Sequence, residues 1–263
     1  MSKIIAITCG GGDKVFKVNK AYVEYVRDAG MSPMVVTPGT DALAVAKICD
    51  GLIITGGVDL DPTFYGEDNI GSYNIDLERD DIERQLMQSF VMERKPIFGI
   101  CRGFQLIART MLGILNTTEL DFYQHVNSHG KAHSYSLPRN VPSHNVFVNQ
   151  KELYGKGKHH VKVFVNSMHH QALVADKNSN SALYANELGD HLTVLGYTLH
   201  GTSEASMKGL TIIEAFKAQM AGCPMAAVQW HPEELKDVGL IKHFFEEHTT
   251  SEKEEKTAMA GTN

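Results

Sequence analysis

Apolar and polar positions follow two alternating patterns along the first half of the chain. Short apolar runs end at glycines, prolines or polar turns, and most are followed by a segment with apolar residues at helical spacing. The pattern predicts strands at 4–8, 32–37, 52–54 and 96–100 and helices at 18–29, 41–49, 76–95 and 103–112. This alternation predicts an α/β fold in which helices cover both faces of a parallel sheet.

The second half carries a weaker pattern. Residues 116–160 are polar and rich in histidine, with few periodic signals. Beyond them we predict strands at 161–165, 192–198, 210–213 and 225–230, and a closing helix around Leu240, Phe244 and Phe245. Residues 250–263 have no apolar face, so we expect them to be disordered and residues 1–249 to form a single domain.

Composition limits the classes of function. The net charge is −6 and there is no basic block, which argues against a nucleic-acid or anionic-membrane partner. No run of about 18 uncharged apolar residues could span a membrane, and the apolar run at the N-terminus is too short for a signal peptide. We therefore expect a cytoplasmic protein.

Cys101 stands where a strand runs directly into a helix. Of the four cysteines it is the only one placed this way, between Gly99 and Gly103. Such a sharp turn lifts the side chain out of the sheet. The helix N-terminus beneath it stabilises a thiolate, and its free N–H groups can hold an oxyanion. A lone cysteine is more often simply buried, but this setting favours a nucleophile.

A thiol nucleophile needs a base, usually a histidine held by a third group. The strand at 225–230 delivers His231 to its C-terminal end, the edge at which α/β sheets bind ligands and at which Cys101 also lies. Glu233 can turn back to accept a hydrogen bond from the imidazole. The segment taken alone leaves open an ordinary helix start at a proline with an acidic first turn.

The segments Gly99–Gln105 (GICRGFQ) and Gln229–Glu233 (QWHPE) resemble the two signature motifs of class I glutamine amidotransferases. Within that superfamily the chain most resembles the γ-glutamyl-γ-aminobutyrate hydrolase-like group, peptidase family C26, over residues 3–247. The resemblance implies a flavodoxin-like three-layer sandwich with a central, mostly parallel sheet. It also implies a catalytic triad of Cys101, His231 and Glu233, and no metal or organic cofactor.

Two further segments extend the resemblance. Residues 52–62 are similar to the family's strand and oxyanion loop, which implies an oxyanion hole formed by the N–H groups of Gly57 and Arg102. Gln105 matches the position that lines the glutamine pocket. Residues 166–171 (NSMHHQ) resemble an Asn-Ser-x-His-His-Gln segment, which implies contacts with the ends of the substrate from Asn166, Ser167, His169, His170 and Gln171.

The resemblance implies Cys101-dependent hydrolysis of a γ-glutamyl amide, in glutamine or a γ-glutamyl amine, through a thioester. Residues 108–115 depart from the family pattern, which leaves the exact substrate open. Two other functions stay open: a glutaminase subunit that feeds ammonia to a separate synthetase, and a catalytically silent binding protein. A homodimer is open as well, whereas neither nucleic acid nor a membrane is expected as a partner.

The histidine-rich stretch suggests a metal site as a further alternative. His125, His129, His133 and His144 could in principle collect zinc. No cysteine or ordered carboxylate pattern completes such a site, and histidine-rich loops are mostly solvated. We therefore expect no metal, and leave residues 116–160 open as a lid or a partner surface.

Overall fold

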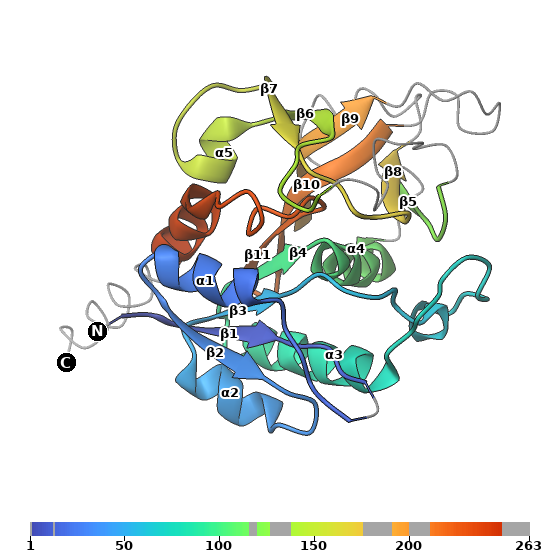
Figure 1. The fold of residues 1–263 in the computed structure, drawn as a ribbon, viewed down its shortest axis with the longest axis vertical. Coiled ribbons are helices and arrows are strands. Elements are labelled where there is room, and N and C mark those ends of the chain that lie inside the picture. Colours follow the sequence, from blue (N-terminus) through green and yellow to red (C-terminus); the bar gives the residue numbers. More distant parts are fainter. Residues whose placement is uncertain are drawn as a thin grey trace.

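One mixed sheet forms the centre of the protein (Figure 1). The computed structural model describes residues 2–12, 14–115, 120–126, 138–175, 191–199 and 211–248. Its strands are β1 (Ile4–Thr8), β2 (Ser32–Val36), β3 (Gly51–Ile54), β4 (Ile97–Ile100), β5 (Leu120–Tyr123), β6 (His144–Val148), β7 (Val161–Val165), β8 (Ala172–Ala175), β9 (Leu192–Leu199), β10 (Thr211–Met220) and β11 (Cys223–Val228). Its helices are α1 (Lys20–Asp28), α2 (Ala42–Ile48), the 3-10 helix η1 (Pro62–Tyr65), α3 (Leu77–Met92), α4 (Arg102–Leu115), α5 (Gln150–Tyr154) and a last helix at 238–248.

The first half builds a layered α/β core. Strands β2, β1, β3, β4 and β11 are neighbours in that order and all run parallel. One apolar cluster packs α2, α3 and α4 on one face of these strands, and a second packs α1 and helix 238–248 on the other. The predicted α/β class is confirmed. The sheet as a whole is mixed, because it continues from β11 into antiparallel strands β10, β9, β6 and β7.

Most of the predicted strands and helices are present, and their observed ends lie within a few residues of the predicted ends. The second half departs furthest, because β10 is longer than the strand predicted at 210–213, and β5, β6, α5 and β8 were not predicted at all. In β10 the apolar pattern is broken by Glu214, a carboxylate that is fully buried and accepts a hydrogen bond from His144 Nε2 at 3.0 Å. Residues 250–263, predicted to be disordered, lie outside the described residues.

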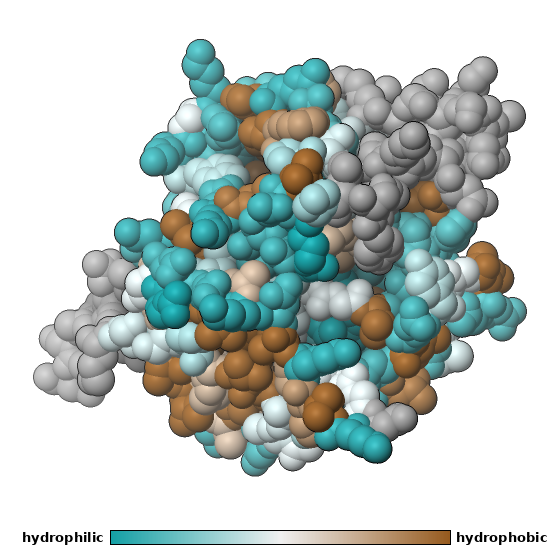
Figure 2. All heavy atoms as spheres, viewed as in Figure 1, coloured by the Kyte–Doolittle hydropathy of each residue, from teal (hydrophilic) through white to brown (hydrophobic). Residues whose placement is uncertain are grey.

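Strand β2 forms one edge of the sheet. Ser32 N–H donates to Lys3 O (2.8 Å), so the backbone nitrogen of the next residue, Pro33, faces away from the sheet. Because proline has no N–H to donate, this edge is a weaker template for pairing with another strand. Figure 2 shows apolar side chains on the lower part of the molecule, in the area of β2 and α2. Val35 of β2 and Ile48 of α2 are exposed apolar residues. Among the described residues, none of the helices is long and apolar enough to cross a membrane.

Helix α4 packs directly onto the end of β3. A Cβ atom added at Gly103, in the first turn of α4, would stand 2.1 Å from the carbonyl oxygen of Ile54. That contact is with backbone and cannot be relieved by moving a side chain. The position of α4, and with it the turn that carries Cys101, therefore depends on glycine at residue 103.

We predict that Gly103→Ala lowers the free energy of unfolding by about 2 kcal/mol or more, because the new methyl group overpacks the contact with Ile54. Chemical denaturation measures this change. The matched control is Gly113→Ala in the same helix, where a Cβ would meet nothing within 4 Å. It should raise stability by about 0.5–1 kcal/mol, because glycine weakens a helix relative to alanine. Equal effects of the two substitutions would contradict the packing argument.

Candidate active site

Cys101 occupies a strained backbone position between β4 and α4. Its φ is 53°, in the left-handed region that residues other than glycine rarely adopt. The strain is held by the surrounding structure, since Cys101 N–H donates to Val228 O (2.9 Å) and Cys101 O accepts from Gln105 N–H (3.1 Å). A backbone held in this way at the end of a strand is typical of a functional turn.

His231 and Glu233 join Cys101 at the same edge of the sheet. His231 Nδ1 lies 2.7 Å from Glu233 Oε1, and both side chains are buried. Cys101 lies beside the same stretch of the loop as this imidazole, since both approach Gly56. Burial alone would lower the pKa of His231, but the charge of Glu233 and then the neighbouring Cys101 raise it from 6.5 to about 10. The structure thus brings the three predicted triad residues together and favours a protonated imidazole.

Asn166 holds the backbone of His231. Its side-chain nitrogen donates to His231 O (3.0 Å) and Arg139 O (2.7 Å), and its side-chain oxygen accepts from His231 N–H (2.9 Å). The family resemblance implied a substrate contact for Asn166. That contact stays a prediction; Asn166 is only 1% exposed, and its amide is bound to the backbone of His231. Asn166 therefore fixes the position of His231.

Tyr22, which the sequence motifs did not single out, completes the surroundings of His231. Its hydroxyl accepts a hydrogen bond from Gly56 N–H (2.9 Å) and lies 3.3 Å from His231 Nδ1. Burial, and then the nearby Glu233 and Cys101, raise the pKa of Tyr22 well above its usual value, so the hydroxyl stays protonated. From sequence, Tyr22 is only one of several apolar positions on the inner face of α1, so no pattern distinguished it.

The loop after β3 passes close to Cys101 and His231. A Cβ at Gly56 would lie 2.7 Å from His231 Cε1 and 3.3 Å from Cys101 Cβ, so the backbone approaches this pair closely. Arg102 follows Cys101, and its N–H lies in the first turn of α4, where N–H groups have no intrahelical acceptor. These positions suit Gly57 N–H and Arg102 N–H as oxyanion donors, which stays a prediction.

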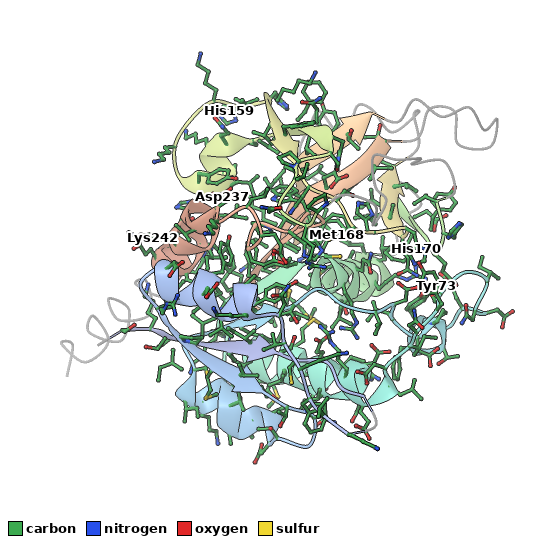
Figure 3. All side chains as sticks on the ribbon, viewed as in Figure 1. Tyr73, His159, Met168, His170, Asp237 and Lys242 are labelled. Carbon is green, nitrogen blue, oxygen red and sulfur yellow. The ribbon has the colours of Figure 1, made fainter. Side chains whose placement is uncertain are left out.

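The NSMHHQ segment makes mainly internal contacts. His169 is buried with Nδ1 2.8 Å from Gln171 O, and burial lowers the pKa of its imidazole to about 4, so it is neutral. His170 Nε2 lies 2.9 Å from Asp59 Oδ2, and its ring stacks on Tyr73 with centroids 4.5 Å apart, as Figure 3 shows. The side chains of Ser167 and Gln105 are buried, and Gln171 Nε2 donates to Ser72 Oγ (2.8 Å).

An open groove of about 1250 Å³ gives access to Cys101 and His231. Asp59, Met168 and Arg139 also line it, and Tyr73 stands on its wall. His170, one of the predicted substrate-binding residues, contacts two residues of the groove: its Nε2 bonds Asp59 and its ring stacks on Tyr73. A carboxylate, a guanidinium, a thiol and an imidazole therefore line the same groove.

The sequence profile of the peptidase C26 family matches residues 10–233. The chain belongs to the peptidase C26 family. It is 29% identical over 238 residues to a Schizosaccharomyces pombe protein that bears a provisional glutamine amidotransferase name, which covers 89% of this chain and 80% of that protein. It is 28% identical over 224 residues to a glutamine amidotransferase-like protein of Lactococcus lactis, covering 84% and 82%.

A solved structure agrees in fold with this C26 family member. A Thermoplasma acidophilum protein provisionally assigned as one subunit of GMP synthase superposes with a TM-score of 0.57 at 17% identity, over 98% of each chain. The fold is thus that of the class I glutamine amidotransferases. Membership of the C26 family supports amide-bond hydrolysis of the glutamine amidotransferase type in general.

The histidine stretch does not form a metal site in the part of the chain that the structure describes. There, no group of three or more His, Cys, Asp or Glu side chains is placed to hold a metal ion. His125 Nδ1 lies 3.0 Å from His170 Nδ1, and His144 contacts Glu214. His129 and His133 lie outside the described residues.

We predict that Glu233→Gln lowers the pKa of His231 from about 10, because burial then acts without the carboxylate charge that opposes it. Nuclear magnetic resonance titration of labelled imidazole measures the midpoint. The matched control is Glu234→Gln at the next residue, whose carboxylate bonds Arg139 rather than His231. The account is wrong if both variants leave the same His231 midpoint as the unsubstituted protein.

The same shift has a consequence for stability. The pKa of His231 is higher in the folded protein than its ordinary 6.5, so protonation of His231 stabilises the fold. That contribution is complete below about pH 6.5 and is lost as the pH rises through about 10. In unfolding experiments across this window, Glu233→Gln should remove part of the pH dependence that the unsubstituted protein shows.

Proposed function

We propose that this protein hydrolyses γ-glutamyl amide bonds, in glutamine or in γ-glutamyl amines, through a γ-glutamyl thioester on Cys101. One observation carries the proposal: Cys101 and His231 line the same open groove, and Glu233 Oε1 lies 2.7 Å from Nδ1 of that imidazole. A thiol, a base and an orienting carboxylate in this order are the parts that acyl transfer to cysteine needs. Membership of the C26 family supports the same reaction class.

In the first step the Cys101 thiolate attacks the carbon of the γ-carboxamide. The carbonyl oxygen gains negative charge, which the N–H groups of Gly57 and Arg102 stabilise. The protonated imidazole of His231 then gives its proton to the leaving nitrogen, and ammonia or an amine departs. The C–S bond forms in the attack and gives a tetrahedral intermediate; the C–N bond breaks when this intermediate collapses, and the glutamyl group remains on Cys101 as a thioester.

In the second step water attacks the thioester. Neutral His231 removes a proton from the water, and the second tetrahedral intermediate is held by the same two N–H groups. Its collapse releases glutamate and restores the thiolate beside the imidazolium. Glu233 favours the charged imidazole in both steps, and Asn166 keeps its backbone in place.

The charges along the groove support a glutamyl substrate. Asp59 and Arg139 line the same groove as Cys101, and they match the α-amino and α-carboxylate groups of a glutamyl residue in sign. His170 steadies Asp59 at 2.9 Å and Tyr73 by stacking. We propose that the NSMHHQ segment acts on substrate binding mainly through these neighbours.

The experiment is release of glutamate from glutamine and from a panel of γ-glutamyl amines. We expect release from at least one of them, and Cys101→Ala should reduce kcat at least about a thousandfold because no other side chain replaces the nucleophile. The matched control is Cys223→Ala, a buried cysteine on β11 whose thiol bonds Lys95 O and lies outside the groove lining. Activity in Cys101→Ala equal to that of the control would contradict the proposal.

The same assay separates the other functions. Release from a γ-glutamyl amine indicates a free-standing hydrolase. Glutamine hydrolysis that is slow alone and rises when a synthetase is added indicates a protein that supplies ammonia to a partner, and the name of the Thermoplasma acidophilum relative likewise describes one part of a synthase. No release, together with no reaction of Cys101 with thiol reagents, indicates a binding protein that has kept the fold.

A further inference from the structure

Four charged side chains lie buried behind the Gly56–Gly57 loop. Arg79, Asp80 and Glu83 come from α3 and Arg102 from α4, and each side chain is at most 5% exposed. Arg79 Nε donates to Glu83 Oε1 at 2.8 Å, and Arg102 pairs with both Asp80 and Glu83. Two positive and two negative charges thus balance. Burying charges is costly even when they are paired, so their retention suggests a task beyond stability.

Arg79 reaches out of this cluster to the loop. Its Nη2 donates to Thr55 O (3.0 Å), Thr55 Oγ1 (2.9 Å) and Gly56 O (3.0 Å). Its Nη1 fills the space beside Gly57, where an added Cβ would stand only 2.0 Å away. One guanidinium therefore fixes two successive carbonyl groups and leaves no room for a side chain at residue 57.

The cluster in turn fixes Arg79. Glu83 Oε1 accepts from both Arg79 Nε and Thr8 Oγ1 (2.6 Å). Burial alone would raise the pKa of Glu83, but the guanidinium charges of Arg102 and Arg79 hold it below its usual value, so the carboxylate is ionised. Arg79 thus has a fixed anionic partner on one side and the loop carbonyls on the other.

The orientation of the Gly56–Gly57 peptide follows from these contacts. In a planar trans peptide the C=O and the N–H point in opposite directions. Neither residue has a Cβ to resist rotation, so the peptide could turn over at little intrinsic cost. The bond from Arg79 to Gly56 O selects one orientation, in which Gly57 N–H points away from the guanidinium. Cys101 and His231 lie close to Gly56 in this loop.

We propose that Arg79 is a positioning residue, which holds the Gly56–Gly57 peptide so that Gly57 N–H is presented to the oxyanion that forms beside Cys101. The inference rests on the acyl-transfer chemistry of the proposed function. It does not depend on the substrate being a γ-glutamyl amide, so it can be tested with a simple acylating reagent.

The test compares two reactions of the Cys101 thiol. With p-nitrophenyl acetate the sulfur bonds the acetyl carbon through an oxyanion intermediate, and p-nitrophenolate leaves. With iodoacetamide the sulfur displaces iodide directly and no oxyanion forms. The ratio of the two rate constants, after subtraction of the Cys101→Ala background, reports the oxyanion donors and cancels changes in thiol reactivity or access.

Arg79→Lys keeps the charge beside Glu83 but loses the forked contact with the loop carbonyls. We expect the ratio to fall at least about tenfold, since loss of one oxyanion donor costs on the order of a hundredfold or more. If the lysine variant does not fold, Arg79→Met takes its place in the test, because its side chain has a stem of similar length and no charge. The matched control is Asp80→Asn, which disturbs the same buried cluster at Arg102 and leaves the contacts of Arg79 with Gly56 intact.

The control should keep its ratio within about twofold of the unsubstituted protein, even if its melting temperature falls as far as that of the Arg79 variant. An unchanged ratio in the Arg79 variant would overturn the inference, and so would an equal fall in both variants. A ratio in the unsubstituted protein no higher than that of N-acetylcysteine would also overturn it. A high ratio that depends on Arg79, without glutamate release from any substrate, would support the inference and count against the proposed function.

Discussion

The close contact between the start of α4 and the end of β3 is the constraint on which the rest of the site depends. With no side chain at Gly103, the helix packs against the carbonyl of Ile54, and the chain must turn sharply at Cys101 with a φ of 53°. Val228 O on β11 holds the turn from the other side. The same two strands, β3 and β11, lead directly into Gly56 and toward His231. The proposed nucleophile, oxyanion loop and base therefore meet because three parallel strands end at one edge.

Two sets of buried polar contacts hold the side chains and the loop at this edge of the sheet. On the His231 side, Glu233, Asn166 and Tyr22 fix the imidazole and its backbone, and Tyr22 also bonds Gly56 N–H. On the Arg102 side, the cluster around Glu83 fixes the loop carbonyls through Arg79. Hydrogen bonds and ion pairs in a dry interior restrict the motion of the groups that make them. The groove above them can thus admit substrates while the reacting groups keep their positions.

The features of the fold and of the site that depend on a local sequence pattern could be predicted. The alternation of strands and helices predicted the parallel core, and the motifs around Cys101 and His231 predicted the residues that the structure brings together. Tyr22 and Arg79 could not be predicted, because no pattern sets either apart from its neighbours on an amphipathic helix, and Gly56, which both contact, lies far from them along the chain. For Asn166 the family resemblance implied a substrate contact, and only the three-dimensional structure shows its bonds with the backbone of His231, 65 residues further along the chain. Strand β10 was underestimated because Glu214 is buried by pairing with a distant histidine.

The central claim is that Cys101 carries the acyl group during turnover. Mass spectrometry of peptides from acid-quenched reactions with the preferred γ-glutamyl substrate tests it most directly. The account predicts a glutamyl adduct on the peptide that contains Cys101, which appears before the first turnover ends and disappears when the substrate is exhausted. Sustained release of glutamate with Cys101 unmodified at every time point would contradict it.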